Sequence, residues 1–188
     1  TCSVANAVFV DCTANRDISG RYLELFKHKI SVVTCNKIAN SLSFDYFKQL
    51  ADVALNEGVN YKYETTVGAA LPVLSTIRQI IDSGDNIVSI EGILSGTLNY
   101  LFSKYNGEVS FGQLVKDAVE EGYTEPDPRI DLGGTDVLRK FLIMCRCSGM
   151  QIEREDIDFS TFLPDNILDI NANPNFLPYS SSFYTGLA

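Results

Sequence analysis

The sequence predicts an α/β protein in which helices alternate with the strands of a parallel sheet. Residues 4–10 and 30–33 are two short, nearly continuous apolar runs, which is typical of strands covered on both faces. Between them, apolar residues recur at helical spacing, at Ile18, Tyr22, Leu25 and Phe26. A strand, a helix and a second strand in this order favour parallel pairing, because the helix returns the chain to the edge where the first strand began.

The following segments continue this alternation. A second helix is expected after Ser41 or Ser43, and the run Asn56-Glu57-Gly58 is expected to end it. Its predicted inward side consists of Phe44, Phe47, Leu50, Ala51, Ala54 and Leu55. A third strand over 61–64 and a helix over about 72–82 follow, the latter with Leu74, Ile77, Ile80 and Ile81 inward and Gly84 as its C-terminal cap.

The second half of the chain contains further helix and strand signals. The expected elements are, in order, a strand over 87–93, a helix over 110–121, an irregular loop over 123–134, a helix over 135–147 and an irregular tail after residue 165. Ser110 and Gln113 form a capping-box pattern at the start of the first of these helices. Thr135 is the expected N-cap of the second, and Gly149 is expected to end it.

Bulk composition limits the class of protein. The chain has 188 residues, of which 45% are hydrophobic, and a net charge of −9. This acidic balance argues against nucleic acid or an anionic membrane as a main partner. No apolar run reaches the roughly 18 residues of a membrane span, so we expect a cytoplasmic protein without membrane attachment.

Cysteine and histidine usage excludes several kinds of site. The five cysteines are Cys2, Cys12, Cys35, Cys145 and Cys147, an odd number without a C-x-x-C motif. We therefore expect reduced, mostly buried thiols. His28 is the single histidine, so the sequence gives no support for a histidine-based zinc site or a Ser-His-Asp triad.

Polar residues follow the first two predicted strands. Asp11-Cys12-Thr13-Ala14 comes after the first strand, and Thr34-Cys35-Asn36-Lys37 comes after the second. In open α/β sheets, ligands bind beyond the carboxyl ends of the strands. Lys37 at such a point suits a phosphate, a carboxylate or a proton transfer, and the alternative is that it begins a solvated loop.

Two turns are candidate binding segments. Glu64, followed by small residues up to Leu71, offers a carboxylate and several carbonyl oxygens to a hard cation. The alternative is a turn whose glycine is needed for backbone shape. The run Ser95-Gly96-Thr97 offers amides and hydroxyls to a ligand carboxylate, and the alternative is ordinary helix capping.

An acidic loop followed by an Asp–Lys pair is the strongest chemical signal. Two prolines restrict the backbone around Glu125 and Asp127. Asp136 and Lys140 are four residues apart and therefore share a helix face. Carboxylates raise the pKa of a lysine and burial lowers it, and a lysine between these effects can exchange a proton with an alcohol or aldehyde oxygen. The alternative is a surface ion pair worth a few tenths of a kcal/mol.

Several motifs occur together in a fixed order. They are Asp11–Ala14, Val32–Lys37, Glu64–Pro72, Glu91–Thr97, and Gly122–Arg129 followed by Asp136–Lys140. Over about residues 5–165 the chain resembles homoserine dehydrogenase, and the last of these motifs is the most specific. In its details the chain is most similar to the dehydrogenase part of bifunctional aspartokinase–homoserine dehydrogenases.

The resemblance implies NAD- or NADP-dependent interconversion of L-aspartate 4-semialdehyde and L-homoserine, on the route to threonine, methionine and isoleucine. It implies that Lys140 exchanges a proton with the carbonyl oxygen and that Lys37 is a second essential lysine, between cofactor and substrate. The implied substrate-binding residues are Glu125, Asp131 and Asp136. The implied cofactor-binding residues are Thr13, Ala14, Lys37 and Gly122. The resemblance also implies a structural monovalent cation, such as sodium, held by Glu64, Val67, Ala69 and Leu71.

Several positions depart from the family pattern. The G-x-G-x-x-G loop that holds the pyrophosphate is not in this sequence, and neither is the glycine-rich C-terminal segment. Cys35, Ala70 and Ile130 stand where the family has proline, glycine and aspartate, and the tail after about residue 169 does not match. These departures lead us to expect a truncated chain.

The resemblance implies a fold as well. Residues 1–70 are expected to be the C-terminal part of a Rossmann-type nucleotide-binding domain, and residues 71–188 an incomplete α/β catalytic and dimerisation domain with a mixed sheet. A homodimer acting on a small molecule is expected. One alternative is an inactive fragment that retains only dimerisation or structure. Another is a semialdehyde dehydrogenase, which needs a nucleophilic cysteine with an activating base.

Overall fold

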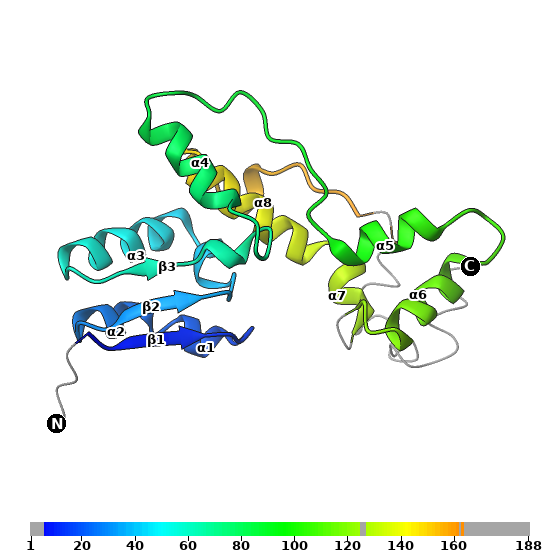
Figure 1. Ribbon diagram of the computed structural model, residues 1–188, viewed down its shortest axis with the longest axis horizontal. Helices are drawn as coiled ribbons and strands as arrows, with labels where there is room; N and C mark the ends of the chain where they lie inside the picture. The colour runs from blue at the N-terminus through cyan, green and yellow to red at the C-terminus, as the bar shows by residue number, and fades with distance from the viewer. Residues whose placement is uncertain (1–5, 125–126, 162, 164–188) are drawn as a thin grey trace. The chain divides into compact units, whose positions relative to one another are not determined.

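The computed structural model describes residues 6–124, 127–161 and 163 of the chain (Figure 1). Two compact units are present, and we describe each by itself. The first unit comprises Thr1–Ile90 and Arg139–Ile157, and the second comprises Glu91–Leu138 and Asp158–Ala188. The domain boundary that we predict near residue 70 stays a prediction.

The first unit is built on a small parallel sheet. Strands β1 (Val8–Asp11), β2 (Ser31–Thr34) and β3 (Tyr61–Lys62) lie in the order β1-β2-β3, and both pairs are parallel (Figure 1). The register places Asp11 of β1 beside Thr34 of β2. The predicted parallel sheet and the α/β class are therefore confirmed.

Helices α2 (Tyr22–Lys27) and α3 (Phe44–Asn56) pack on one face of this sheet. The core there consists of Tyr22, Phe26, Val32, Ala39, Leu50 and Ala54. On the other face Val8, Val10 and Val33 are exposed. The prediction of strands covered on both faces is therefore wrong for the described residues, because the helices they contribute lie on one side only.

Two details of these helices differ from expectation. The helix predicted between the first two strands is divided into α1 (Arg16–Ser19) and α2, with Gly20 between them. Glycine has a low helix propensity, which favours a break at this point. In α3, Ser43 is the N-cap as predicted, but Ala51 and Leu55 are exposed, Leu55 to 80%. Leu50 and Ala54, one turn apart, form the buried stripe instead.

The remaining parts of the first unit are mostly helical. The short 3₁₀ helix η1 (Ala39–Ser41) follows Lys37, and the predicted third strand is shortened because the 3₁₀ helix η2 (Glu64–Thr66) follows it closely. Helix α4 (Val73–Asp82) is formed as predicted and is followed by Gly84 with a φ of 85°. Leu74 and Ile77 are its buried residues. The C-terminal part of α8 (Thr135–Cys147) and the 3₁₀ helix η3 (Arg154–Asp156) complete the unit.

The described residues of the second unit form helices and loops. These helices are α5 (Gly96–Lys104), α6 (Phe111–Glu120), α7 (Pro128–Leu132) and the first turn of α8. Their core is made of Leu101, Leu114, Val115, Ala118, Leu132 and Leu163.

The strand predicted over 87–93 is wrong. This segment is irregular, and Val88 is 97% exposed. A strand needs a neighbouring strand to satisfy its backbone groups, and the described part of the chain offers none here. The predicted mixed sheet is likewise not formed by the described residues of this region.

Local capping explains most helix boundaries of the second unit. The Ser110 hydroxyl accepts a hydrogen bond from Gln113 N (3.2 Å), but the Gln113 side chain bonds to Asp117 and does not complete a capping box. Helix α7 lies in the loop that we predict to be irregular. It forms because Asp127 caps it, accepting from the Arg129 amide (3.0 Å), and because Pro128 occupies its first turn.

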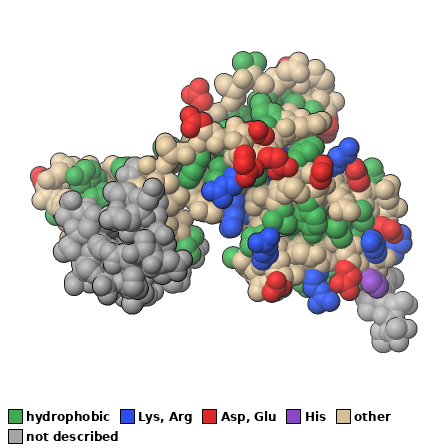
Figure 2. Space-filling model, turned by 180° about the vertical axis from the view of Figure 1, so that it is seen from behind, with side chains coloured by type: hydrophobic (Ala, Val, Ile, Leu, Met, Phe, Trp, Pro, Cys, Tyr) green, Lys and Arg blue, Asp and Glu red, His purple; other side chains and the backbone are tan. Residues whose placement is uncertain are grey.

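Figure 2 shows Lys and Arg side chains interspersed with Asp and Glu on the face that it presents. In the described ranges, no helix is long and apolar enough to cross a membrane. Cys145 is buried, Cys35 and Cys147 are half-buried, and Cys12 is exposed, so the expectation of mostly buried thiols is wrong. Cys2 lies outside the described residues.

Candidate active site

A buried carboxylate organises the carboxyl end of the sheet. Asp11, the last residue of β1, is 1% exposed. Its Oδ1 accepts hydrogen bonds from the amide (2.8 Å) and the hydroxyl (2.7 Å) of Thr13. Its Oδ2 accepts hydrogen bonds from the Tyr22 hydroxyl and from Asn36 Nδ2 (3.1 Å). One side chain thus fixes the turn after β1 and the residue before Lys37.

These hydrogen bonds determine the charge state of the cluster. Burial by itself raises the pKa of Asp11, but hydrogen bonds from Tyr22, Thr13 and Asn36 outweigh it, so the pKa lies below its ordinary value. The pKa of Tyr22 is raised, first by burial and then by its hydrogen bond to the Asp11 carboxylate. Asp11 is therefore ionised and Tyr22 neutral at physiological pH.

The structure brings three of the predicted site residues to this one edge. Thr13 and Ala14 are exposed in the turn after β1, and Lys37 is half-buried after β2. The two strands end side by side, since Cys35 N donates to Asp11 O (3.1 Å) beyond the last paired residues. Thr13, Ala14 and Lys37 therefore occupy the position where ligands bind in parallel sheets.

The backbone around Lys37 is held on both sides. Before it, Asn36 Nδ2 donates to Asp11 and to Asn15 O (3.0 Å), and Asn36 Oδ1 accepts from Ile38 N (3.0 Å). After it, Ser41 N donates to Lys37 O (3.1 Å). The lysine is thus presented by a rigid turn, which differs from the alternative of a solvated loop.

Asp136 and Lys140 lie on α8, as predicted. They are four residues apart in a continuous helix, and both are half-buried. This spacing gives them a common helix face. Both residues are thus less exposed than a pair on a fully solvated surface.

An Asp127–Arg129 pair that sequence reasoning did not identify lies at the start of α7. Arg129 is buried, and its Nε and Nη2 donate to the two oxygens of Asp127 at 2.8–3.2 Å. Asp127 therefore stabilises the start of α7. Glu125, the predicted substrate ligand between the two prolines, lies outside the described residues.

Three further predicted positions, Asp131, the Ser95–Thr97 turn and Gly122, lie in the second unit. Asp131 is half-buried in α7, and the Thr97 hydroxyl lies 3.0 Å from its Oδ1 and 2.8 Å from Tyr123 O. Ser95 caps α5 by accepting from Leu98 N (3.1 Å). Gly122, exposed after α6, has a φ of 76°, and no atom lies within 4 Å of the place that a Cβ would occupy. The position therefore allows the close approach of a ligand to the backbone.

The predicted cation segment has a structural use of its own. Oε1 of Glu64 accepts hydrogen bonds from Leu74 N (2.8 Å) and Ser75 N (3.1 Å), which are amides of the first turn of α4. The Leu71 carbonyl accepts from Val73 N (2.9 Å). In the described ranges, no group of three or more His, Cys, Asp and Glu side chains is arranged to hold a metal ion. A cation here would depend on backbone carbonyls as well as on Glu64.

The N-terminal and the C-terminal part of the chain each match a known protein family. Residues 1–64 match the family described as "Homoserine dehydrogenase, NAD binding domain". Residues 72–174, more than half of the chain, match the family described as "Homoserine dehydrogenase". The second match includes α8 with Asp136 and Lys140, and the first includes Thr13, Ala14 and Lys37.

Relatives and solved structures agree with these matches. The chain is 42% identical over 178 residues to a chloroplastic bifunctional aspartokinase/homoserine dehydrogenase of Zea mays, covering 95% of this chain and 19% of the relative. A hyperthermophilic archaeal homoserine dehydrogenase in complex with NADPH has a TM-score of 0.68 and 25% identity, over 75% of this chain and 43% of that one. A Candida auris protein of unknown function has a TM-score of 0.80 and 29% identity, over 97% and 54%. The chain thus spans about a fifth of the curated relative.

Sequence reasoning placed Asp11 at the end of the first strand but did not identify its organising role, and it missed the roles of Tyr22 and Arg129. Asp11 ends an apolar strand and is followed two residues later by Thr13, a pattern typical of a side chain that hydrogen-bonds to its own turn. That local signal was available in the sequence. The contribution of Tyr22 was not, because its partners Asp11 and Thr34 lie 11 and 12 residues away.

Proposed function

Because this chain belongs to the homoserine dehydrogenase family, we propose that the protein containing it interconverts L-homoserine and L-aspartate 4-semialdehyde with NAD or NADP. The observation that carries the proposal is helix α8, which holds Asp136 and Lys140 one turn apart and half-buried within the family match. The reaction would serve the synthesis of threonine, methionine and isoleucine.

Lys140 is the proposed acid and base. In the direction of reduction, its ammonium group donates a proton to the oxygen that becomes the hydroxyl of homoserine. In the direction of oxidation, the neutral amine accepts that proton. Asp136, Asp131 and Glu125 are the proposed substrate ligands, and their carboxylates suit the ammonium end of the substrate.

We propose that the carboxyl edge of the sheet binds the dinucleotide. Thr13 and Ala14 are exposed there, Lys37 is half-buried, and Gly122 of the second unit leaves its backbone accessible. We propose that these four residues contact the cofactor, with Lys37 also near the substrate. When bound, the cofactor supplies the nicotinamide that gains or loses the hydride. Asp11 keeps the Thr13 turn and Asn36 in place for this contact.

A monovalent cation is a further part of the proposal. The carboxylate of Glu64 and the carbonyl oxygens of Val67, Ala69 and Leu71 are hard oxygen donors of the kind that sodium prefers. Since Oε1 of Glu64 already caps α4, the cation would use the second carboxylate oxygen. Its role would be structural, because proton and hydride transfer take place elsewhere.

We propose that the whole protein is a homodimer, which the family resemblance suggests and which sedimentation of the extended protein tests. A cytoplasmic location stays a prediction. The maize relative is described as chloroplastic.

The test is a homoserine oxidation assay that follows formation of the reduced nicotinamide. It compares NAD and NADP, and it compares this chain with a version extended at both ends. We expect the extended version to be active. Activity confined to the extended version would support the alternative that this chain alone is an inactive fragment. An inactive extended version that binds either dinucleotide would contradict the proposal.

A control distinguishes homoserine dehydrogenase activity from the alternative of a semialdehyde dehydrogenase. A semialdehyde dehydrogenase acylates a cysteine, so its activity would be abolished by changing the responsible thiol. Cys12 and Cys35 follow the two strands at the proposed cofactor edge. The control measures oxidation of L-aspartate 4-semialdehyde, the reaction that such an enzyme would carry out. We expect no such activity in the extended protein, and a semialdehyde oxidation that C12S or C35S abolishes would favour the thiol mechanism.

A further inference from the structure

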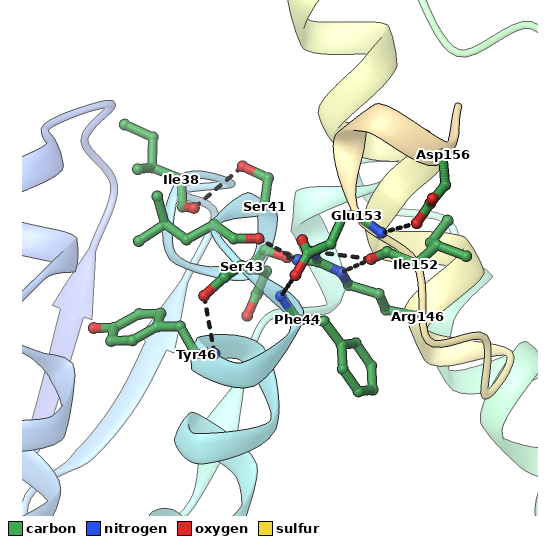
Figure 3. A network of polar contacts seen from close by, with 11 residues as sticks. Ile38, Ser41, Ser43, Phe44, Tyr46, Arg146, Ile152, Glu153 and Asp156 are labelled. Carbon is green, nitrogen blue, oxygen red and sulfur yellow. Dashed lines mark hydrogen bonds and ion pairs between the residues drawn. The ribbon is translucent and has the colours of Figure 1, made fainter. Parts of the chain in front are cut away.

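Arg146, near the C-terminus of α8, is almost completely surrounded by polar partners (Figure 3). Its side chain is 0% exposed. Its Nη1 donates to the carbonyl oxygens of Asn40 (2.9 Å) and Leu42 (2.6 Å). Its Nε and Nη2 donate to Ile152 O at 3.2 and 3.1 Å, and Nη2 also donates to Oε2 of Glu153 (2.9 Å). We call this arrangement the Arg146 clamp.

Glu153 extends the clamp to the start of α3. Its Oε1 accepts a hydrogen bond from Phe44 N (2.8 Å), an amide at the N-terminus of that helix (Figure 3). Its own amide donates to Asp156 Oδ2 (2.8 Å). The carboxylate thus joins the guanidinium to a helix end, where negative charge is favourable. The rings of Phe44 and Phe47 lie 5.9 and 5.8 Å from the guanidinium carbon, within the range of cation–π attraction.

The carbonyls that Arg146 holds belong to the turn that presents Lys37. Asn40 lies in η1, and Ser41 of the same 3₁₀ helix donates through its amide to Lys37 O (3.1 Å). The Ser41 hydroxyl donates to Ile38 O (3.1 Å), a contact that Figure 3 also shows. Displacement of Asn40 and Leu42 would therefore be transmitted through η1 to Lys37. On the other side, Asn36 ties Lys37 to Asp11.

Arg146 is also rigidly connected to Lys140. The two residues are six positions apart on α8, which corresponds to about 9 Å along a helix axis. Both belong to the first compact unit, as do Lys37 and η1. A single buried side chain thus links the turn of one proposed essential lysine to the helix of the other.

We propose that Arg146 is a positioning residue that fixes the Lys37 turn relative to the part of α8 that carries Lys140. Burial of a guanidinium is costly, and an apolar side chain of similar volume often serves stability as well. An arginine at this site does something that an apolar residue cannot do, because its planar fork satisfies several carbonyls at once and fixes their directions. The inference rests on the proposed function for its catalytic meaning, but the mechanical link is independent of it.

The experiment uses the extended protein with four variants. R146M removes the N–H donors and keeps a side chain of similar volume. R146K keeps the positive charge but not the planar guanidinium group. E153A removes the contact with Phe44 N at a half-buried site, which provides a milder disruption should R146M fail to fold. R154M changes an exposed arginine of η3 and is the matched control. Amide hydrogen exchange of residues 37–44 and of β1, together with kcat and KM for homoserine, are measured for each.

We expect R146M to exchange about tenfold faster at residues 37–44, with β1 unchanged. We expect kcat to fall about 10²-fold, the scale of a misplaced reactive group, with KM within a few-fold of wild type. R146K should not restore kcat, E153A should give an intermediate result and R154M should match wild type. Unchanged exchange at 37–44, uniformly faster exchange, or faster exchange with normal kcat would each overturn the proposal. An inactive wild type would refute the proposed function, and the exchange data would then decide the mechanical link alone.

Discussion

The carboxylate of Asp11 accepts a hydrogen bond of 3.1 Å from Asn36 Nδ2 and so joins the ends of two neighbouring parallel strands. Cofactor residues are proposed on both sides of this contact, Thr13 after β1 and Lys37 after β2. The arrangement of the proposed cofactor residues therefore depends on Asp11, which is itself 1% exposed and out of reach of a ligand.

The charge of Asp11 should make stability depend on pH. Its pKa in the folded chain lies below the ordinary value of 3.8, because its hydrogen bonds outweigh the effect of burial. The stabilisation is fully present above the pKa of the unfolded chain and is lost as the pH falls through the lower pKa of the folded chain. We expect D11N to flatten the loss of stability that wild type shows as the pH falls below about 5, measured by denaturant unfolding.

The control for this experiment is D52N, which changes an exposed aspartate of α3. It should leave the acid limb of the stability curve as in wild type. Parallel loss of stability in D11N and wild type on acidification would show that Asp11 is not the source.

Removal of the Tyr22 hydroxyl should destabilise the first unit. Its oxygen contacts the Asp11 carboxylate and Thr34 Oγ1 (2.9 Å), and its ring packs edge-on against Tyr61 at 5.8 Å. Y22F keeps the ring contact and removes the donor, so we expect a loss of about 1–3 kcal/mol in the free energy of unfolding. Y105F, at an exposed tyrosine of the second unit, should cost nothing measurable by the same denaturant titration. An equal effect of the two changes would refute the assignment.

Replacement of Lys140 should affect turnover more than binding. We expect K140M in the extended protein to lower kcat by about 10²–10⁴-fold, the usual contribution of general acid–base catalysis, with a small change in KM. Steady-state kinetics of homoserine oxidation measure both constants. K116M, at an exposed lysine of α6, is the matched control. Near-normal turnover in K140M would rule out the proton-transfer role.

Glu64 should show two separable effects. Its Oε1 caps the first turn of α4, so E64A should lower the free energy of unfolding by about 1–2 kcal/mol, whereas E64Q keeps an oxygen acceptor and should lose less. If the proposed cation is bound, sodium chloride should raise the Tm of wild type above that in choline chloride of equal ionic strength, and this difference should vanish in E64A. The same difference in E64A would exclude Glu64 as a ligand.

Local sequence signals predicted the helices well because their causes lie within a few residues. Ser43 and Ser110 cap α3 and α6 as their positions indicate. Thr135, the predicted N-cap of α8, is instead its first helical residue, because the first helical hydrogen bond runs from Leu138 N to Gly134 O. The helix α7 was missed although its cap, Asp127 before Pro128, is also local. Prolines favour loops, which is why the sequence predicts a loop there, but Pro128 occupies the first turn of the helix, where its missing N–H costs nothing.

Features that depend on contacts between residues far apart in the sequence could not be predicted. Segment 87–93 has the composition of a strand, but a strand forms only against a neighbour, and composition does not show whether one is present. Arg146 meets Asn40 across 106 positions of sequence, so no local pattern distinguishes it from Arg139 or Arg154. The motifs around Thr13, Lys37 and Lys140 could be recognised, whereas the residues that hold them could not.

The alternation of side chains along β1 and β2 has a practical consequence for anyone who redesigns this protein. Phe9, Asp11 and Thr34 belong to the face that carries the core and the site, whereas Val8, Val10 and Val33 belong to the exposed one. Residues of the exposed face can therefore be replaced without changing residues of the core face. In this chain, threonine at the three valine positions would keep a β-branched shape and leave the core-facing residues unchanged.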